Sequence, residues 1–374
     1  MDLSSRTKGV GGSTSPLGRL RLADPILLVT SLALTAFGIL AVYIAGQDDR
    51  EAYALNQTMG FVVGLAAAVP LAMMDYRRLR SYLPLIYGIT VVVLLAVWII
   101  GFSAKGAQRW IDIGPVQIQP SEFAKLFVVV VFAGYFADHR LSDNLTFLKS
   151  VGILSLPAFL VFAQPDLGSA LVFGAIFFIM AFVGGAKLYQ IGGLLVSGVA
   201  LAALALKIGV LQEYQISRLT AFLDPTGVSD ESYQVFQSKL AIGSGGVTGK
   251  GFDATTLANL GFLPEDHTDF IFSNLAERTG FVGGLLLLGL FFVLVWRMLH
   301  VATVSRDRFG VLIAVGIATI FLFHIFVNVG MTMGLMPVTG IPLPFISYGR
   351  SNLVVSLIAL GLLQSVAIRS KRDI

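Results

Sequence analysis

Long runs without a charged residue restrict what this chain can fold into. The stretch from Pro25 to Gly46 contains no Asp, Glu, Lys or Arg, and several similar runs follow it. Soluble domains carry roughly a quarter of charged residues, whereas the charged share here is 13%. Because a helix of about 20 mostly apolar residues crosses a bilayer, the pattern predicts an integral membrane protein. The first run is too long for the apolar core of a signal peptide, so it is expected to stay as a spanning helix.

The apolar runs predict an all-α fold with ten transmembrane helices. The boundary between the fifth and the sixth depends on the short stretch "QPDLG". We expect a single membrane domain over residues 25–368, between tails at residues 1–24 and 369–374. The ten segments are 25–46, 57–74, 83–101, 121–137, 151–164, 169–185, 190–206, 281–301, 309–330 and 350–368.

An even number of spans places both ends of the chain on one side of the membrane. If that side is the cytoplasm, 16 of the 26 lysines and arginines lie in cytoplasmic segments, in keeping with the positive-inside rule. We therefore expect cytoplasmic termini. Since this orientation accounts for the basic residues, the net charge of +4 does not indicate a nucleic-acid partner. The absence of cysteine excludes disulfides and zinc–thiolate sites.

The connection at residues 207–280 is long and would face outside. Its stretch "SDESYQVFQSKLAIG" has acidic residues in a first turn and Tyr233, Phe236 and Leu240 on one face, which predicts an amphipathic helix on the membrane or the bundle. The following "IGSGGVTGKGF" is not a nucleotide-binding loop, because Gly251 follows Lys250 where Ser or Thr is required. Its amides and Lys250 are still suited to an outer phosphate, and a flexible hinge is the alternative.

Polar residues mark the start of the fourth span in "QPSEFAKLF". Pro120 and Ser121 predict a helix start with Ser121 as the N-cap. Glu122 and Lys125 are three residues apart and can pair on one face. Charges inside a spanning helix are functional candidates; the alternative is an ion pair that only locks two helices. Just before them, "RW" at Arg109 is either part of the same site or an interfacial anchor.

Two further stretches carry candidate site residues. In "LPEDHTDF", Asp269 either caps the short apolar helix that follows or acts as a general base, and His267 is a second possible base. In "MPVTGIPLPFISYGRSN", three prolines predict a non-helical segment, which is tolerated in a membrane only where protein or a water-filled cavity covers it. Arg350, Ser351 and Asn352 would line that cavity.

On the ninth span, His324 and Asn328 are four residues apart and therefore share a helix face. Such residues are more often interhelical hydrogen-bonding groups than catalysts. The remaining outer groups are several cations and one candidate base. This composition fits an anionic, phosphate-bearing substrate, which would either react or be transported.

Five stretches, in this order, resemble the SEDS family (shape, elongation, division and sporulation). They are "GAQRWIDIG…QPSEFAKL", "QPDLGSA", "FQSKLAIGSGGVTGKGF", "LPEDHTDFIF" and "MTMGLMPVTGIPLPFISYG". The resemblance extends from about Asp24 to Leu363. The wording of the last stretch and the short N-terminus are more similar to the elongation members than to the division members.

The resemblance implies a peptidoglycan glycosyltransferase of the bacterial cytoplasmic membrane, with ten transmembrane helices. Such proteins polymerise lipid II outside the membrane and work with a class B penicillin-binding protein, a transpeptidase, and other membrane proteins of the elongation complex. Asp269 matches the essential acid of the family. We expect substrate contacts from motif residues Arg109, Trp110, Gln119, Ser121, Glu122, Lys125, Asp166, Lys250, His267, Thr268, Ser347 and Ser351.

The implied reaction inverts an anomeric centre, so it needs a base on the nucleophile and charge stabilisation at the leaving pyrophosphate. The resemblance assigns the base to Asp269 and the stabilising cations to Arg109, Lys125 and Lys250. The metal requirement is open: a divalent cation, Mg²⁺ or Mn²⁺, would assist the same step. The alternatives are a lipid II flippase, or a scaffold of the wall-synthesis complex.

The chain departs from the family pattern at two places. It reads "SYGRSN" where the family usually reads "SYGGSS", so Arg350 and Asn352 replace Gly and Ser. It also reads "AERTG" where "AEELG" is usual. The first departure puts a bulky cation beside Ser347 and Ser351, and so puts their roles in question.

Overall fold

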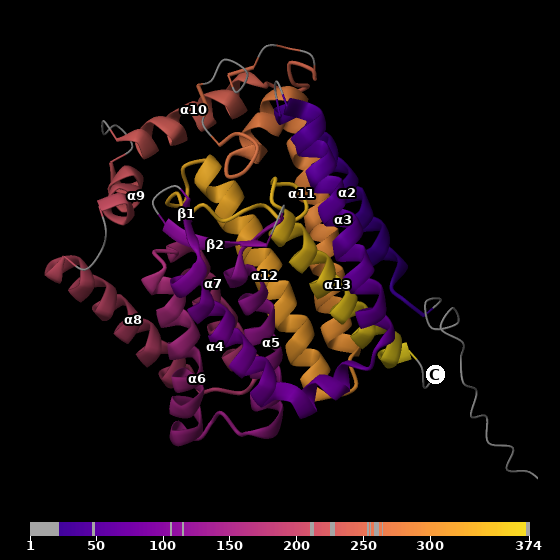
Figure 1. Cartoon of the computed structure of the whole chain (residues 1–374), viewed down its shortest axis with the longest axis vertical. Helices are drawn as coiled ribbons and strands as arrows, with labels where there is room; N and C mark the ends of the chain where they lie inside the picture. Colours follow the sequence, from indigo (N-terminus) through magenta and orange to yellow (C-terminus); the bar gives the residue numbers. More distant parts are fainter. Residues whose placement is uncertain are drawn as a thin grey trace, which may run out of the picture.

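The computed structural model describes residues 22–371 except for positions 47–48, 105–106, 114–115, 210–212, 225–228, 253, 255, 258–261 and 264. Most of the described chain is one bundle of long helices, with shorter elements at one end (Figure 1). The bundle consists of α2 (Pro25–Ala45), α3 (Arg50–Met73), α4 (Leu83–Ile100), α5 (Pro120–Asp138), α6 (Asn144–Ala163), α7 (Leu167–Val183), α8 (Leu188–Ile208), α11 (Ile271–Val304), α12 (Arg308–Thr332) and α13 (Arg350–Lys371). The shorter elements at that end are α9 (Glu213–Leu223), α10 (Asp230–Ser244), β1 (Phe102–Ala104), β2 (Ala107–Ile113) and β3 (Val116–Ile118), while the short helix η2 (Tyr76–Tyr82) lies at the opposite end.

A helix overlaps each of the ten predicted apolar segments. Within the described residues, nine helices are long and apolar enough to cross a membrane, and α7 is shorter, at 17 residues. The protein is therefore a multi-pass membrane protein. Residues 1–21 and 372–374 lie outside the described part, and they include most of the expected N-terminal tail and half of the expected C-terminal tail. Helix α13 continues past residue 368 to Lys371, and Arg369 is buried.

The expected all-α fold needs one correction. Strands β1, β2 and β3 form a small antiparallel sheet in the order β1-β2-β3. The register pairs Phe102 with Trp110, and Ile111 with Ile118. The stretch "WIDI" is rich in aromatic and β-branched residues, which favour a strand over a helix. This sheet directly precedes α5, and it places Arg109 and Trp110 at the end of the bundle that carries the shorter elements (Figure 1).

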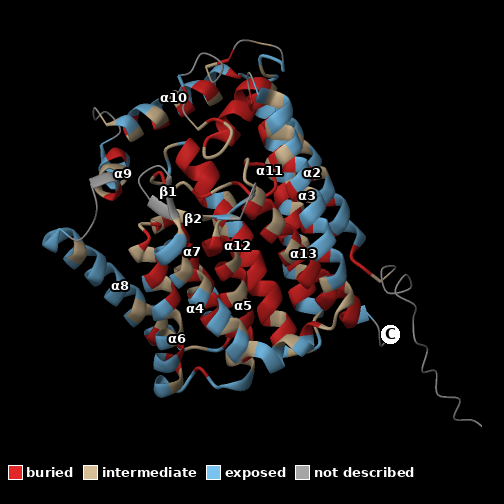
Figure 2. Cartoon of the chain, in the orientation of Figure 1, coloured by how far each residue is buried: buried red, intermediate tan, exposed pale blue. Residues whose placement is uncertain are grey.

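The helices differ strongly in burial. Figure 2 shows buried residues concentrated on α5, α12 and α13, while α8 is exposed along its length. Small residues let α3 and α13 approach closely: a Cβ on Gly361 would lie 2.5 Å from the Ala68 carbonyl oxygen. Close contacts of this kind are typical of helices that pack inside a membrane. The central helices therefore form a rigid frame for the residues at their ends.

The long helix α11 breaks at Gly280, where φ is 67° and ψ is −165°. The glycine-rich loop fills this break: the Gly251 amide donates to the Arg278 carbonyl (3.0 Å), and the Phe281 amide donates to the Gly246 carbonyl (2.9 Å). A Cβ on Gly280 would lie 2.3 Å from the Gly249 nitrogen, so only glycine fits. These contacts give the loop a structural role. They favour neither of the two predicted alternatives, a phosphate-binding loop and a flexible hinge.

The loop's lysine also has a defined partner. Lys250 Nζ lies 2.6 Å from Oε1 of Glu277, whose side chain is fully buried. Glu277 also accepts a hydrogen bond from the Leu257 amide (3.1 Å). The predicted amphipathic helix is confirmed as α10, with Ser229 as its N-cap. It packs through Val235, Ser238 and Ala241, while the predicted apolar face stays exposed.

At the other end of the bundle, Asp307 joins α12 to η2. It caps α12 by accepting from the Gly310 amide (2.8 Å), and it accepts from Tyr76 Oη (2.5 Å) and Arg77 Nε (2.9 Å). Burial raises the pKa of Asp307, but the hydrogen bonds from Tyr76, the Gly310 amide and Arg77 outweigh it, so the pKa lies below its usual value.

We expect Asp307→Ala to lower the free energy of unfolding by about 1–2 kcal/mol, because a helix loses its N-cap. Asp307→Asn should retain most of the cap and lose only the charge. Since the folded pKa is depressed, the charge contributes fully above about pH 4. The contribution disappears as the pH falls through the lowered folded pKa. Thermal unfolding in detergent at several pH values checks this; a stability gap between wild type and Asp307→Asn that does not narrow in acid contradicts it.

Candidate active site

The segment 333–349 connects α12 to α13 without regular secondary structure, as the prolines predict, and it is largely buried from Val338 to Ser347. Buried carbonyl groups need hydrogen-bond donors. Side chains from three helices, α3, α9 and α12, supply them. Arg218 Nη1 donates to the Thr339 carbonyl (3.0 Å), and Asn328 Nδ2 donates to the Ile341 carbonyl (2.9 Å). His324 Nδ1 donates to the Pro342 carbonyl (3.1 Å), and Gln57 Nε2 donates to the Ser347 carbonyl (3.1 Å).

The same segment holds the triplet that contains Asp269. The His267 carbonyl accepts from the Tyr348 amide (2.9 Å), and the Thr268 carbonyl accepts from Ser347 Oγ (2.6 Å). The carbonyl of Asp269 itself accepts from Asn328 Nδ2 (3.0 Å). Three consecutive carbonyls are thus fixed, which orients the side chains between them. The expected interhelical hydrogen bonding is made by His324, which contacts Lys125 of α5, whereas Asn328 bonds two non-helical carbonyls, those of Asp269 and Ile341.

Asp269 does not cap the following helix. Helix α11 begins at Ile271 with Phe270 as its N-cap, and no side chain caps it. The capping alternative is therefore wrong, and the carboxylate of Asp269 points elsewhere. A Cβ built on Gly340 would lie 3.4 Å from Asp269 Oδ2, so the carboxylate lies beside the buried segment.

The neighbours of Asp269 in its loop brace the loop rather than form a second acidic centre. Asp266 accepts from His267 Nδ1 (3.2 Å) and from Asn274 Nδ2 (2.9 Å), and Glu265 accepts from Thr268 Oγ1 (2.9 Å). The ring of His267 lies against Tyr53, with ring centroids 5.0 Å apart. These contacts give Glu265 and Asp266 roles that could not be ranked from their order in the chain.

A second polar cluster lies at the start of α5. Lys125 Nζ is 2.7 Å from Glu122 Oε1, and both side chains are buried, which confirms the predicted pair. Lys125 also lies 3.1 Å from His324 Nε2. Because His324 Nδ1 donates to the Pro342 carbonyl, Nε2 is free to accept from the lysine. The amide of Asn352 completes the cluster by donating to Glu122 Oε2 (3.2 Å).

A third cluster is centred on Asp166. This residue caps α7, accepts from Ser121 Oγ (3.4 Å), and lies 3.9 Å from Arg109 Nη1. Arg109 also donates to the carbonyls of Gln164 and Pro165. The predicted N-cap role of Ser121 was wrong: α5 starts at Pro120 with Gln119 as its N-cap, so the hydroxyl turns toward Asp166 instead.

The predicted site residues thus gather around one buried segment. A Cβ on Gly168 would lie 2.9 Å from the Thr339 carbonyl oxygen and 3.7 Å from Asp166 Oδ1. Asp166 and Asp269 therefore flank the same segment at neighbouring residues. Ser351 Oγ accepts from the Gln119 amide (3.0 Å) and joins α13 to the sheet. Two predicted residues lie elsewhere: Trp110 is paired in β2, and Lys250 is bound to Glu277.

Three polar residues that belong to this arrangement escaped the sequence analysis. Gln57 bonds both the Ser347 carbonyl and the Gly349 amide, and Tyr348 packs against Tyr53 and His267. Arg218 reaches the segment from α9. No local pattern distinguishes these residues from ordinary polar positions, because their partners are far away in the chain.

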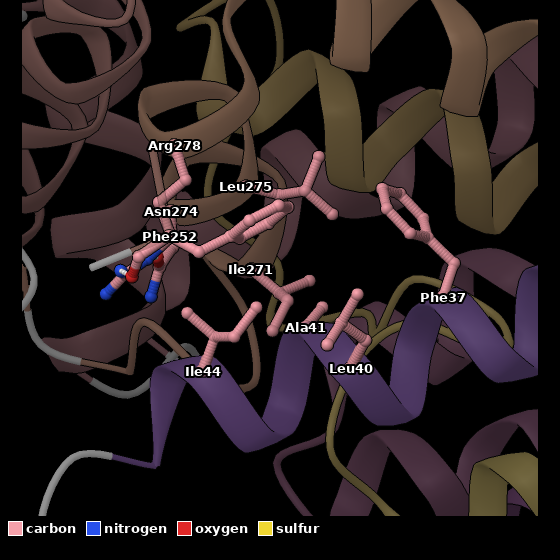
Figure 3. Close-up of a pocket in the computed structure, with 9 residues that line it drawn as sticks. All are labelled: Phe37, Leu40, Ala41, Ile44, Phe252, Ile271, Asn274, Leu275 and Arg278. Atoms are coloured by element: carbon pink, nitrogen blue, oxygen red, sulfur yellow. Dashed lines mark hydrogen bonds between the residues drawn. The ribbon is translucent and has the colours of Figure 1, made fainter. Parts of the chain in front are cut away.

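An open pocket of about 290 Å³ lies between α2 and the first turns of α11 (Figure 3). Apolar side chains line most of it, including Phe37 and Ile271, while Asn274 and Arg278 stand at one end with Phe252. The polar groups at that end are already bonded: Arg278 Nε donates to Asn274 (2.8 Å) and Nη1 to the Phe252 carbonyl (2.6 Å). We therefore place the candidate active site at Asp269.

No group of three or more His, Cys, Asp or Glu side chains that could hold a metal ion occurs in the part of the chain that the structure describes. The divalent cation left open by the sequence, Mg²⁺ or Mn²⁺, thus has no such ligand set among these residues.

Comparison with protein families decides the relationship. The family model that covers FtsW, RodA and SpoVE, described as "Cell cycle protein", matches residues 25–372. The chain belongs to this family. The expected resemblance to the SEDS proteins is therefore confirmed over nearly the whole length.

Individual members of the FtsW/RodA/SpoVE family align along most of their length. Peptidoglycan glycosyltransferase MrdB of Escherichia coli K12 is 37% identical over 349 residues, covering 92% of this chain and 93% of the relative. A probable peptidoglycan glycosyltransferase FtsW of Trichlorobacter lovleyi is 36% identical, covering 93% and 94%. A solved chain from a peptidoglycan synthase complex that coordinates polymerization and crosslinking is 30% identical, with a TM-score of 0.79, covering 94% of this chain and 99% of that one.

The departures from the family pattern have structural explanations. Asn352 binds the buried Glu122 carboxylate through its amide. Arg350 starts α13, and its stem packs against Gly60 of α3, where a Cβ would lie 3.4 Å from the arginine Cα. Arg278, in "AERTG", ties α11 to the loop before it through the Phe252 carbonyl. Ser347 and Ser351 keep backbone partners despite the neighbouring cation.

We expect Lys125→Met to destabilise the protein by about 3–5 kcal/mol, because it leaves the Glu122 charge buried and unpaired. The double variant Glu122→Gln/Lys125→Met should recover most of that loss, and its catalytic activity should stay low. Thermal unfolding and a glycan-polymerisation assay on the same preparations test this. A double variant with normal activity would instead support the alternative in which the pair only locks helices.

Proposed function

We propose that this peptidoglycan glycosyltransferase polymerises lipid II into glycan strands at the outer face of the bacterial cytoplasmic membrane, with Asp269 as the general base. The observation that carries the proposal is the fixing of the His267, Thr268 and Asp269 carbonyls by Tyr348, Ser347 and Asn328. A general base must be held within hydrogen-bond reach of the proton that it removes. A loop clamped at three successive residues meets that requirement.

The reaction would transfer a disaccharide-peptide from its lipid pyrophosphate to the 4-hydroxyl of another sugar. The hydroxyl proton moves to the Asp269 carboxylate as the new C–O bond forms. The bond from the anomeric carbon to the pyrophosphate breaks, and the pyrophosphate leaves with the electron pair. Attack opposite the leaving group inverts the α-linked donor into a β-1,4 bond. One base and a cationic leaving-group site are sufficient for this single displacement.

The expected pyrophosphate cations differ in how firmly they are already paired. Lys125 and Lys250 lie 2.7 Å and 2.6 Å from the buried carboxylates Glu122 and Glu277. Arg109 is 3.9 Å from Asp166, the longest of the three separations. Because it is the least tightly paired, Arg109 is the best placed of the three to stabilise the departing pyrophosphate, a contribution of about 10²–10³ in rate.

We further propose that the chain works with a class B penicillin-binding protein, a transpeptidase, within the elongation complex. The similar chain from a peptidoglycan synthase complex that coordinates polymerization and crosslinking supports a partner of this kind. The elongation role is supported by the wording of "MPVTGIPLPFISYG". Ten spans, cytoplasmic termini and an outer active site complete the proposal, supported by the distribution of lysine and arginine.

We expect Asp269→Asn to abolish strand formation from lipid II while leaving the thermal unfolding midpoint close to that of the wild type, because no hydrogen bond to the Asp269 backbone is lost. The assay uses the purified full chain, with and without the transpeptidase, and resolves strands by length. Asp269→Glu provides a control that keeps the charge. Normal strand synthesis by Asp269→Asn would refute the base assignment, and lipid movement without strands in the wild type would favour a flippase.

A further inference from the structure

A cation that the sequence analysis overlooked lies beside Asp269. Arg218 belongs to α9, in the long connection between α8 and α11. Its Nη1 donates to the Thr339 carbonyl at 3.0 Å, which brings the guanidinium onto the buried segment. The next residue, Gly340, separates this guanidinium from the Asp269 carboxylate.

The distances around Gly340 define this arrangement. An ideal Cβ on Gly340 would lie 3.4 Å from Asp269 Oδ2, 3.6 Å from Arg218 Nη1 and 3.8 Å from Arg218 Nη2. The carboxylate and the guanidinium therefore border the same small space, which is open because residue 340 has no side chain. Gly340 also has φ of +72°, a conformation that favours glycine.

We propose that Arg218 is a positioning residue for Asp269: anchored on the Thr339 carbonyl, its guanidinium faces the carboxylate across Gly340 and holds it oriented and ionised for proton removal. This inference rests on the proposed role of Asp269 as the base. Guanidinium presents five donors in a rigid fork that matches a carboxylate. Both terminal nitrogens of this fork border the Cβ position of Gly340, which the Asp269 carboxylate also borders.

The backbone of the triplet is fixed by Asn328 and by the segment around Ser347. A base must be held close to its productive geometry by neighbouring groups. Arg218 supplies a charged neighbour from a different part of the chain.

The position of Arg218 depends in turn on the outer helices. Ser217 Oγ donates to Glu231 Oε1 at 2.8 Å, which ties α9 to α10. Helix α10 is held on the bundle by Ser238, which lies 2.6 Å from Ser273 and donates to the Thr332 carbonyl. The outer connection thus delivers the cation to the base, and assembly of the base requires α9 to be in place.

Several other groups surround Asp269 and influence its ionisation. Glu265, Asp266 and His267 lie in its own loop, Asp166 lies on the other side of the Thr339 carbonyl, and α12 presents the neutral amide of Asn328. Three of these groups are acidic, and a nearby cation favours the charged form of a carboxylate. Removal of Arg218 should therefore make Asp269 easier to protonate.

Arg218→Gln tests the proposal, measured as strand synthesis from lipid II by the purified full chain with its transpeptidase across a range of pH. We expect activity to fall about 10²-fold, the cost of a misplaced catalytic group. The acid limb of the pH–rate profile should move up by roughly one pH unit or more. Arg218→Lys should restore the acid limb and part of the rate, because it keeps the charge and loses the fork.

Arg306→Gln is the matched control, since Arg306 Nε also donates to a backbone carbonyl, that of Ser370 (3.1 Å), near the other ends of the helices. It should leave the acid limb unchanged. Suppose that Asp269→Asn is inactive. The proposal is then overturned if Arg218→Gln has normal activity, or if the acid limb of its pH–rate profile coincides with that of the wild type. If Asp269→Asn is active, the base assignment itself fails. If Arg218→Gln unfolds, the rate of Arg218→Lys decides instead. A rate equal to that of the wild type then overturns the proposal.

Discussion

The buried, non-helical segment between α12 and α13 imposes the constraint on which the candidate site depends. Its carbonyl groups cannot bond within a helix, and a buried carbonyl without a donor is costly. Arg218 of α9, Asn328 and His324 of α12, and Gln57 of α3 satisfy them. The same side chains then touch the residues of interest: Asn328 binds the Asp269 backbone, and His324 meets Lys125. The side chains that bond the buried carbonyls of the segment therefore also hold the residues of the candidate site in place.

Burial also dictates how the charges are used. Glu122 and Lys125 are deeply buried and bond to each other, to His324 and to Asn352. Arg109 lies farther from its carboxylate partner and is partly exposed. The structure thus distinguishes a tightly paired, buried cation from a partly exposed one, a difference that residue types and positions in the chain do not reveal.

The long connection between α8 and α11 acts as a structural part of the site. Its glycine-rich loop fills the break in α11 at Gly280, and Glu277 and Arg278, just before that break, hold the preceding loop in place. The unusual Arg278 of this chain is thereby accounted for. Helices α9 and α10 lie farther out, and their connection to the bundle determines where Arg218 stands. A loop of this length is more often functional than passive.

Hydropathy and local patterns were enough to predict the membrane class, a helix at each apolar segment, α10, the Glu122–Lys125 pair and the motif that contains Asp269, because these depend on neighbours within a few residues. They misassigned Ser121 as a helix cap and left capping by Asp269 open, because capping residues are weak local signals. They also missed the sheet, because its strands are short. The bond of Ser347 to Thr268 spans 79 residues and that of Arg218 to Thr339 spans 121. Pairings over such distances follow from how the helices pack around a buried backbone, and no local pattern encodes them.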